Sequence, residues 1–94
     1  MHIVTKRRLT EFSARFPKSH EPLMTWYRIA KKGHFANFAE LKASFGSVDY
    51  VKGKHVFDIG GNKFRLITAI HFDQQRVFVR HVMTHAEYDK GAWK

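Results

Sequence analysis

Two short stretches of this chain carry residue types that can act on a phosphate ester. The stretch "THAEYDK" (residues 84–90) contains an imidazole at His85 and a phenol at Tyr88, and "GGNKFR" (residues 60–65) ends in Arg65. Histidine can exchange a proton near neutral pH, and the guanidinium of arginine is a planar fork of donors that suits phosphate. These groups would suit cleavage of RNA without a metal ion. In that reaction a base takes the proton of the 2′-hydroxyl, cations stabilise the pentavalent phosphate and an acid protonates the leaving oxygen.

Each stretch also has a plainer interpretation. Residues 84–90 could form a polar tail in which His85 caps a strand and Tyr88 packs on the core, and the sequence alone does not choose between a tail and a site. Residues 60–62, two glycines and an asparagine, first of all predict a turn, because both residue types tolerate positive φ. A phosphate-binding glycine loop would need a helix after it, whereas a strand pattern follows here and no Lys-Ser or Lys-Thr pair completes a P-loop.

The elements that must position these residues follow from hydrophobic spacing. The stretch "MHIVT" (residues 1–5) predicts a short first strand, and helical spacing then predicts two helices and a short third one. The aromatic residues at helical spacing are expected to be core. The expected boundary residues are Thr5 and Pro17 for the first helix, Ser19 and Gly33 for the second, and Asn37 with Glu40, as a capping box, for the start of the third.

After Gly46 the spacing changes to period two. This predicts three strands joined by short links, at residues 55–59, 63–72 and 76–85, and short links make neighbouring strands antiparallel. One strand, two or three helices and three further strands predict an α+β fold, in which helices pack on one face of an antiparallel sheet. The length of 94 residues predicts a single domain spanning residues 1–94.

Alternation along the strands assigns side chains to the two faces of the sheet. It places Arg65 and Arg80 on adjacent strands, on the open face turned away from the helices. It also turns His81 inward with Val79, which makes the phase of the last strand insecure.

An open basic face beside the helices would form a groove for a nucleic-acid backbone. The negative charge of Asp58 would weaken the positive charge of this face unless Asp58 pairs with a lysine or faces the rim of the core. Lys63 is explained at least as well by an ordinary surface charge as by a role in RNA binding. The residues expected to bind RNA around Arg65 and Arg80 are Lys52, Lys54, His55, Asn62 and Lys63.

The composition narrows the class of partner. Lysine and arginine number 17 against 8 acidic residues, for a formal net charge of +9, which favours nucleic acid, an anionic membrane or an acidic protein. The chain has no cysteine, which suits a reducing compartment, and no apolar run long enough to span a membrane, so we expect a cytoplasmic protein without a membrane partner. His71, His81 and His85 lack the compact pairing of a zinc-binding helix, so neither a metal nor another cofactor is expected.

Taken together, "VFDIGGNKFRLI" followed by "VFVRHVMTHAEYDKGAW" resembles the HigB-type mRNA interferase toxins of bacterial type II toxin–antitoxin pairs, which belong to the RelE/ParE superfamily. The resemblance covers nearly the whole chain, from "MHIVT" through "FGSVDYV" to both motifs. It implies a small RelE-like fold and an endoribonuclease that cuts mRNA, typically on translating ribosomes. It also implies neutralisation by a cognate antitoxin, commonly a helix-turn-helix protein of the HigA type.

The resemblance also implies roles for individual residues. It assigns phosphate stabilisation to Arg65 and Arg80, and proton transfer to His85 as base or acid, with Tyr88 as the alternative. Lys52 and Lys54 would contact the RNA backbone or hold a catalytic proton. The residues that match the family motifs are Asn62, Arg65, Arg80, Thr84, His85, Glu87, Tyr88 and Asp89.

Two other functions stay open on sequence alone. The same superfamily has a gyrase-directed branch of binding inhibitors that cleave no RNA, and membership there would predict supercoiling defects rather than cut transcripts. A plain RNA- or DNA-binding module would show salt-dependent binding without toxicity.

Overall fold

Five strands of the described chain, residues 1–91 and 93, form one sheet in the order β1-β5-β4-β3-β2 in this computed structural model. Residues 92 and 94 of the predicted domain lie outside the description. β1 pairs in parallel with β5, and the other neighbours are antiparallel. The predicted α+β class is therefore confirmed, with one parallel pair added. The strands are β1 (His2–Val4), β2 (Asp49–Val51), β3 (Lys54–Ile59), β4 (Phe64–His71) and β5 (Arg76–Thr84).

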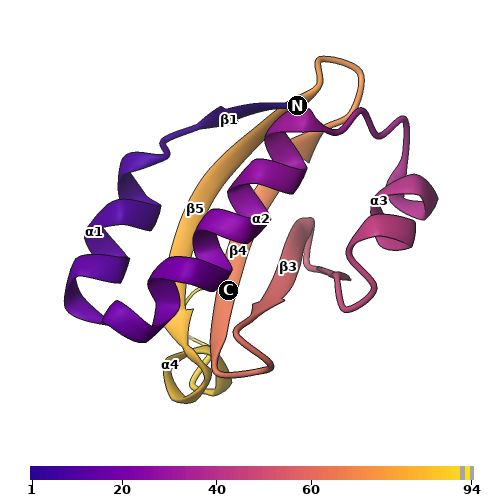
Figure 1. Ribbon diagram of the computed structural model, residues 1–94. Helices are drawn as coiled ribbons and strands as arrows, with labels where there is room; N and C mark the ends of the chain where they lie inside the picture. The colour runs from indigo at the N-terminus through magenta and orange to yellow at the C-terminus, as the bar shows by residue number, and fades with distance from the viewer. Residues whose placement is uncertain (92, 94) are drawn as a thin grey trace.

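Helices cover one face of this sheet. In Figure 1, α2 lies across β5 and β4, α1 lies beside β5, α3 lies beside β3, and α4 follows the lower end of β5. Leu9 and Leu23 of the helices and Leu66 of β4 are fully buried between the two layers. The helical elements are α1 (Arg7–Arg15), the 3₁₀ turn η1 (Pro17–Ser19), α2 (His20–Lys32), α3 (Phe38–Ser44) and α4 (His85–Asp89). Of the helices described, none is long and apolar enough to cross a membrane.

The predicted caps are only partly confirmed. Asn37 caps α3, where its Oδ1 accepts from the Glu40 N–H. Ser19 is the N-cap residue of α2, but its hydroxyl donates to the Phe16 carbonyl instead of accepting from the helix. The predicted cap at Thr5 is wrong, because Thr5 adopts φ +70° and Lys6 takes the cap position of α1.

Tight turns with positive φ connect the strands that follow. Gly60, Gly61 and Asn62 have φ of +65°, +61° and +84°, so the predicted turn between β3 and β4 is confirmed. Lys52 and Gly53 have φ of +50° and +81°, the pattern of a two-residue type I′ hairpin between β2 and β3. The turn at residues 60–62 fixes the start of β4, and with it the position of Arg65.

A β-bulge in β5 reverses the side-chain phase along that strand. Thr68 pairs with Val79 and Ile67 pairs with His81, so Arg80 is an extra residue without a counterpart in this register. Beyond the bulge, Val82 packs against the core beside Leu66. The predicted inward position of His81 is therefore wrong, because one inserted residue moves every later side chain to the other face.

Candidate active site

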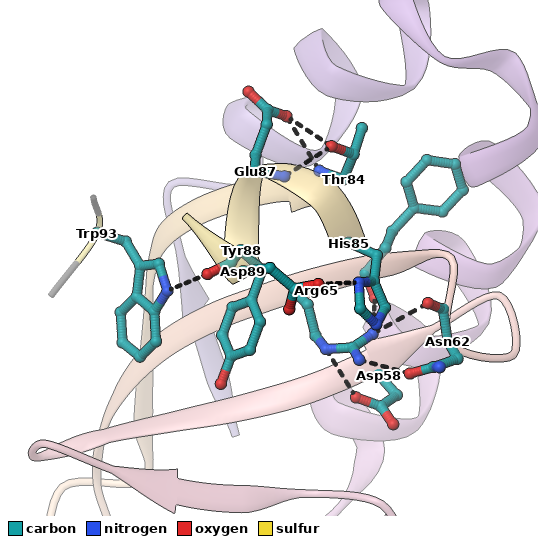
Figure 2. Close-up of polar contacts among 10 residues, drawn as sticks. Asp58, Asn62, Arg65, Thr84, His85, Glu87, Tyr88, Asp89 and Trp93 are labelled. Atoms are coloured by element: carbon teal, nitrogen blue, oxygen red, sulfur yellow. Dashed lines mark hydrogen bonds and ion pairs between the residues drawn. The ribbon is translucent and has the colours of Figure 1, made fainter. Parts of the chain in front are cut away.

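Arg65 is the centre of a polar cluster at the start of β4. Its residue is only 8% exposed, and its guanidinium lies among Asp58, Asn62 and the ring of Tyr88 (Figure 2). Nε forms an ion pair of 3.2 Å with Oδ1 of Asp58, which faces Arg65 across the β3–β4 pair. Nη2 donates to Oδ1 of Asn62, and Nη1 donates to the carbonyls of Asn62 and Phe64 at 3.2 and 3.3 Å.

These contacts hold the guanidinium in one orientation. Arginine has five N–H donors in a rigid fork, and the four contacts engage one on Nε, two on Nη1 and one on Nη2. Within the described residues, a second donor on Nη2 is left for a substrate oxygen. Asp58 neutralises part of the local charge but fixes the fork. The sequence suggested a lysine as the partner of Asp58, and the structure gives Arg65 instead.

α4 carries the groups that can transfer protons. Nδ1 of His85 lies 2.8 Å from Oδ2 of Asp89, one helical turn later, and the two side chains are 41% and 60% exposed. A carboxylate on Nδ1 fixes the tautomer and the orientation of an imidazole, which leaves Nε2 to meet the substrate. The His85 N–H also donates to the carbonyl of Lys63 at 3.0 Å, so α4 is tied to the turn that leads into β4.

A capping box begins α4. The Thr84 hydroxyl accepts from the Glu87 N–H at 3.2 Å, and Oε1 of Glu87 accepts from the Thr84 N–H at 3.0 Å. The hydrogen bonds from Thr84 hold the pKa of Glu87 below its ordinary value, with a smaller contribution from the charge of Arg15. The predicted strand end at residue 85 is therefore a helix start, and the capping box orients the first turn, which includes His85.

Tyr88 links α4 to Arg65. Its ring centre lies 5.3 Å from the Arg65 guanidinium, and its other neighbour is the ring of Trp93 at 5.1 Å in a stacked arrangement. Burial raises the pKa of the Tyr88 phenol above its ordinary value, partly offset by the charge of Arg65. The phenol is therefore protonated at neutral pH, where it can donate a proton or a hydrogen bond.

Arg80 lies apart from this cluster, in a cleft of about 230 Å³ between α1 and β5. The Arg8 guanidinium donates to the Arg80 carbonyl at 2.7 Å, and the Arg80 guanidinium lies over the ring of Phe78 at 5.7 Å. Burial and then the charges of Arg8, Lys54 and Arg80 lower the pKa of His81 in this cleft. The cleft is lined by Arg8, Glu11, Phe12, Arg15, Arg80, His81 and Val82.

The other residues expected to bind RNA do not gather in one place. Asn62 and Lys63 belong to the turn beside Arg65. Lys54 acts on the pKa of His81 and therefore lies toward the cleft, whereas Lys52 stands in the β2–β3 turn. His55 is not brought to this face, because it is 5% exposed and packs against Phe38 and Phe72 on the helix side.

Sequence reasoning missed functional partners that the structure supplies. Asp89 holds His85, Asp58 holds Arg65, and Arg8 and Arg15 complete the cleft of Arg80. One sequence signal was available, because "THAE" has the spacing of a capping box, and a helix there puts residues 85 and 89 on one face. For the metal-ligating groups, residues 1–91 and 93 contain no cluster of three or more histidine and acidic side chains.

Comparison with known proteins decides the family. The model of the HigB toxin family, described as the RelE-like toxic component of a toxin–antitoxin system, matches residues 19–91. The chain belongs to the HigB toxin family. It is 35% identical to the mRNA interferase toxin HigB of Escherichia coli (strain K12). The 92 aligned residues cover 95% of this chain and 88% of that relative. It is also 37% identical to the mRNA interferase HigB of Escherichia coli O6:H1 (strain CFT073). The 93 aligned residues cover 96% of this chain and 90% of that relative.

The HigB assignment confirms the resemblance noted in the sequence. The family match spans η1 to α4 and includes the Arg65 cluster, His85 and Tyr88. Both relatives are named as mRNA interferases, so the gyrase-directed alternative is not favoured.

Proposed function

We propose that this HigB-family chain is the toxin of a toxin–antitoxin pair and cleaves mRNA as an endoribonuclease. The family description and the names of the two relatives support this activity. The single observation that carries it is the His85–Asp89 pair on α4, tied to β4 beside the guanidinium of Arg65.

In this proposal His85 is the general base. Asp89 holds Nδ1, so Nε2 takes the proton of a ribose 2′-hydroxyl. The 2′-oxygen then forms a bond to the adjacent phosphorus, and the bond from phosphorus to the 5′-oxygen breaks. The products are a 2′,3′-cyclic phosphate and a new 5′-hydroxyl end, and the imidazolium afterwards gives its proton to water.

Arg65 stabilises the charge that develops on phosphorus. Its fork is fixed by Asp58 and Asn62, so no reorganisation is needed as the pentavalent phosphate forms. Tyr88 supplies the proton of the leaving 5′-oxygen, since its raised pKa keeps the phenol protonated before the reaction and lets the phenolate regain a proton afterwards.

The cleft of Arg80 holds the RNA backbone rather than the reacting phosphate. Arg8, Arg15 and Arg80 line it, and the charge of Arg15 reaches Glu87 on α4, so the cleft borders the proposed site. Lys54 adds positive charge on the same face. We assign these residues, with Lys63 and Asn62 at the turn, to positioning of the strand by its phosphates.

Family membership gives the chain an antitoxin partner. We propose further that this partner is a helix-turn-helix protein, that the toxin acts in the cytoplasm, and that its substrate is mRNA on translating ribosomes. A chain with a formal net charge of +9 is suited to RNA-rich surroundings.

The test maps new 5′ ends on a defined mRNA incubated with the purified protein, with and without translating ribosomes. We expect cuts on ribosome-bound message that disappear when the ribose at the cut carries a 2′-O-methyl group, because the attacking hydroxyl is then blocked. Cuts that persist in the methylated message would overturn the mechanism, and cuts on free RNA would remove the ribosome from it. Message left intact in both arms by folded protein would refute the nuclease itself.

A further inference from the structure

A second pocket lies at the opposite end of β3 from the Arg65 cluster. It is a cavity of about 440 Å³ on the helix side of the sheet, between α3 and the β2–β3 hairpin, and its walls are mostly aromatic. It is lined by Phe38, Tyr50, Gly53, His55, Ile70 and Phe72.

His55 is the unusual member of this pocket. It is 5% exposed, and three rings surround it at centroid distances of 5.6 Å for Phe38, 4.9 Å for Tyr50 and 5.5 Å for Phe72. Among the residues that the structure describes, Nδ1 of His55 has no hydrogen-bond partner. A buried polar atom without a partner costs free energy, so a ligand that bonds to it gains more than it would from an apolar wall.

The rim of the pocket combines an exposed ring with positive charge. Tyr50 is 61% exposed, an unusual exposure for a large side chain on an edge strand. The rigid turn beside it holds Lys52 at φ +50°. An aromatic face beside a lysine suits single-stranded RNA, because bases stack on aromatic rings while phosphates bind cations.

We propose that this pocket binds one unstacked RNA base, with Tyr50 as the stacking surface, Nδ1 of His55 as the hydrogen-bonding group, and Lys52 on a flanking phosphate. The proposal rests on the proposed function, since it names a further contact to the same class of substrate. Asp58 points to the Arg65 face and His55 to the helix face of β3, so the bound base belongs to a nucleotide away from the cleaved bond. The pocket therefore anchors RNA and takes no part in the chemistry.

A neutral imidazole suits this task. Burial lowers the pKa of His55, so the ring is uncharged at neutral pH and can accept or donate one hydrogen bond to a base edge. An apolar peptide side chain would fill the aromatic walls but would leave Nδ1 without a partner and Lys52 without a counter-charge. This is why we favour a base over a segment of a protein.

The test measures binding of 2′-O-methyl oligonucleotides, which the enzyme cannot cut by attack of a 2′-hydroxyl. We expect Tyr50→Leu to weaken binding about 5- to 150-fold, the range for loss of one stacked base. The slope of affinity against salt should stay unchanged, whereas Lys52→Ala should lower that slope. The matched control is Tyr27→Leu, a tyrosine on α2 that lies beside Lys6 and Lys31 but outside the pocket.

A second arm guards against a folding defect and identifies the source of the base. His55→Phe keeps a ring in the pocket while removing Nδ1, and we expect it to weaken binding with an unchanged melting temperature or a higher one. Weaker binding to free oligonucleotide points to a base of the message, and weaker binding only to purified ribosomes points to ribosomal RNA. Either result supports the pocket.

Two results would overturn the proposal. Wild-type affinity of both Tyr50→Leu and His55→Phe for oligonucleotides and ribosomes would reduce the pocket to a packing feature. Weakened binding of the cognate antitoxin alone would mean that the pocket takes a protein side chain. Because the oligonucleotides resist cleavage, these outcomes are separate from failure of the His85 mechanism, which the cleavage assay measures.

Discussion

Replacement of His85 by alanine tests the central assignment most directly. The substitution removes the imidazole, whose Nδ1 lies 2.8 Å from Oδ2 of Asp89. It keeps the backbone N–H of residue 85, which donates to the carbonyl of Lys63. A positioned general base contributes about 100- to 10,000-fold to a rate, which corresponds to roughly 2.7–5.4 kcal/mol of barrier. We therefore expect His85→Ala to lower the rate of mRNA cleavage by at least ~100-fold.

The same substitution should scarcely affect folding. The His85 and Asp89 side chains are 41% and 60% exposed, and an exposed pair of this kind contributes roughly 0.2–1 kcal/mol. For a domain of this size, 1 kcal/mol corresponds to about 4–8 °C in melting temperature, so the expected loss is at most ~8 °C. A large fall in rate with a small fall in melting temperature separates chemistry from structure.

The assay compares cleavage on translating ribosomes with thermal unfolding of the same protein samples. Imidazole added to the buffer should restore part of the activity of His85→Ala, because the vacated site is open to solvent. The matched control is His71→Ala, an exposed histidine at the far end of β4, which should cleave like the wild type. Wild-type cleavage by folded His85→Ala would refute the assignment of the base.

Three further predictions concern Asn62, Thr84 and His55. Asn62→Gly keeps the left-handed turn but removes the Oδ1 acceptor of Arg65, so denaturant titration should show a loss of roughly 1.5 kcal/mol, and Asn62→Ala should lose about 1 kcal/mol more through backbone strain. Thr84→Ala removes the cap of α4 and should cost about 1 kcal/mol. The lowered pKa of Glu87 stabilises the fold above pH 4.5, and this contribution is lost as pH falls through the folded value, so wild-type melting curves should show an acid loss that Glu87→Gln lacks. His55 has a pKa below 6.5, so its burial destabilises the fold as pH falls from 6.5 to the folded value, and His55→Phe should flatten melting temperature over that window.

Hydrophobic spacing predicted most of the fold. The first strand, the three helices and the three long strands are all present near their predicted residues, because each buries one face and so imposes period 3.6 or period 2 on its sequence. The elements missed are short. β2 has three residues and α4 has five, too few for a period to show. The parallel pairing of β1 with β5 depends on contacts between distant segments, which local spacing does not encode.

The sequence predicted most residues of the candidate site, but it did not predict how they are arranged. Arg65, Asn62, His85 and Tyr88 do lie together, since the turn at residues 60–62 and the start of α4 meet at one end of β4. Arg80 does not join them, because Arg65 lies opposite Met83 and Arg80 comes three residues earlier along β5.

His55 shows that a face assignment needs a fixed reference. Counting by twos from Phe57, a core residue, places His55 on the helix side, where the structure has it. Grouping it with its charged neighbours Lys52 and Lys54 put it on the basic face instead.

The parallel pairing of β1 with β5 has a consequence for how this toxin is made. His2 and Arg76 are neighbours in the sheet, so the first strand synthesised waits for the last strand before its edge can be paired. α4, with His85 and Tyr88, follows that last strand along the chain. A growing chain that has reached only β4 therefore lacks both a finished sheet and the groups to which we assign proton transfer. Under the proposed mechanism, such a chain cannot yet cut the message on the ribosome that synthesises it.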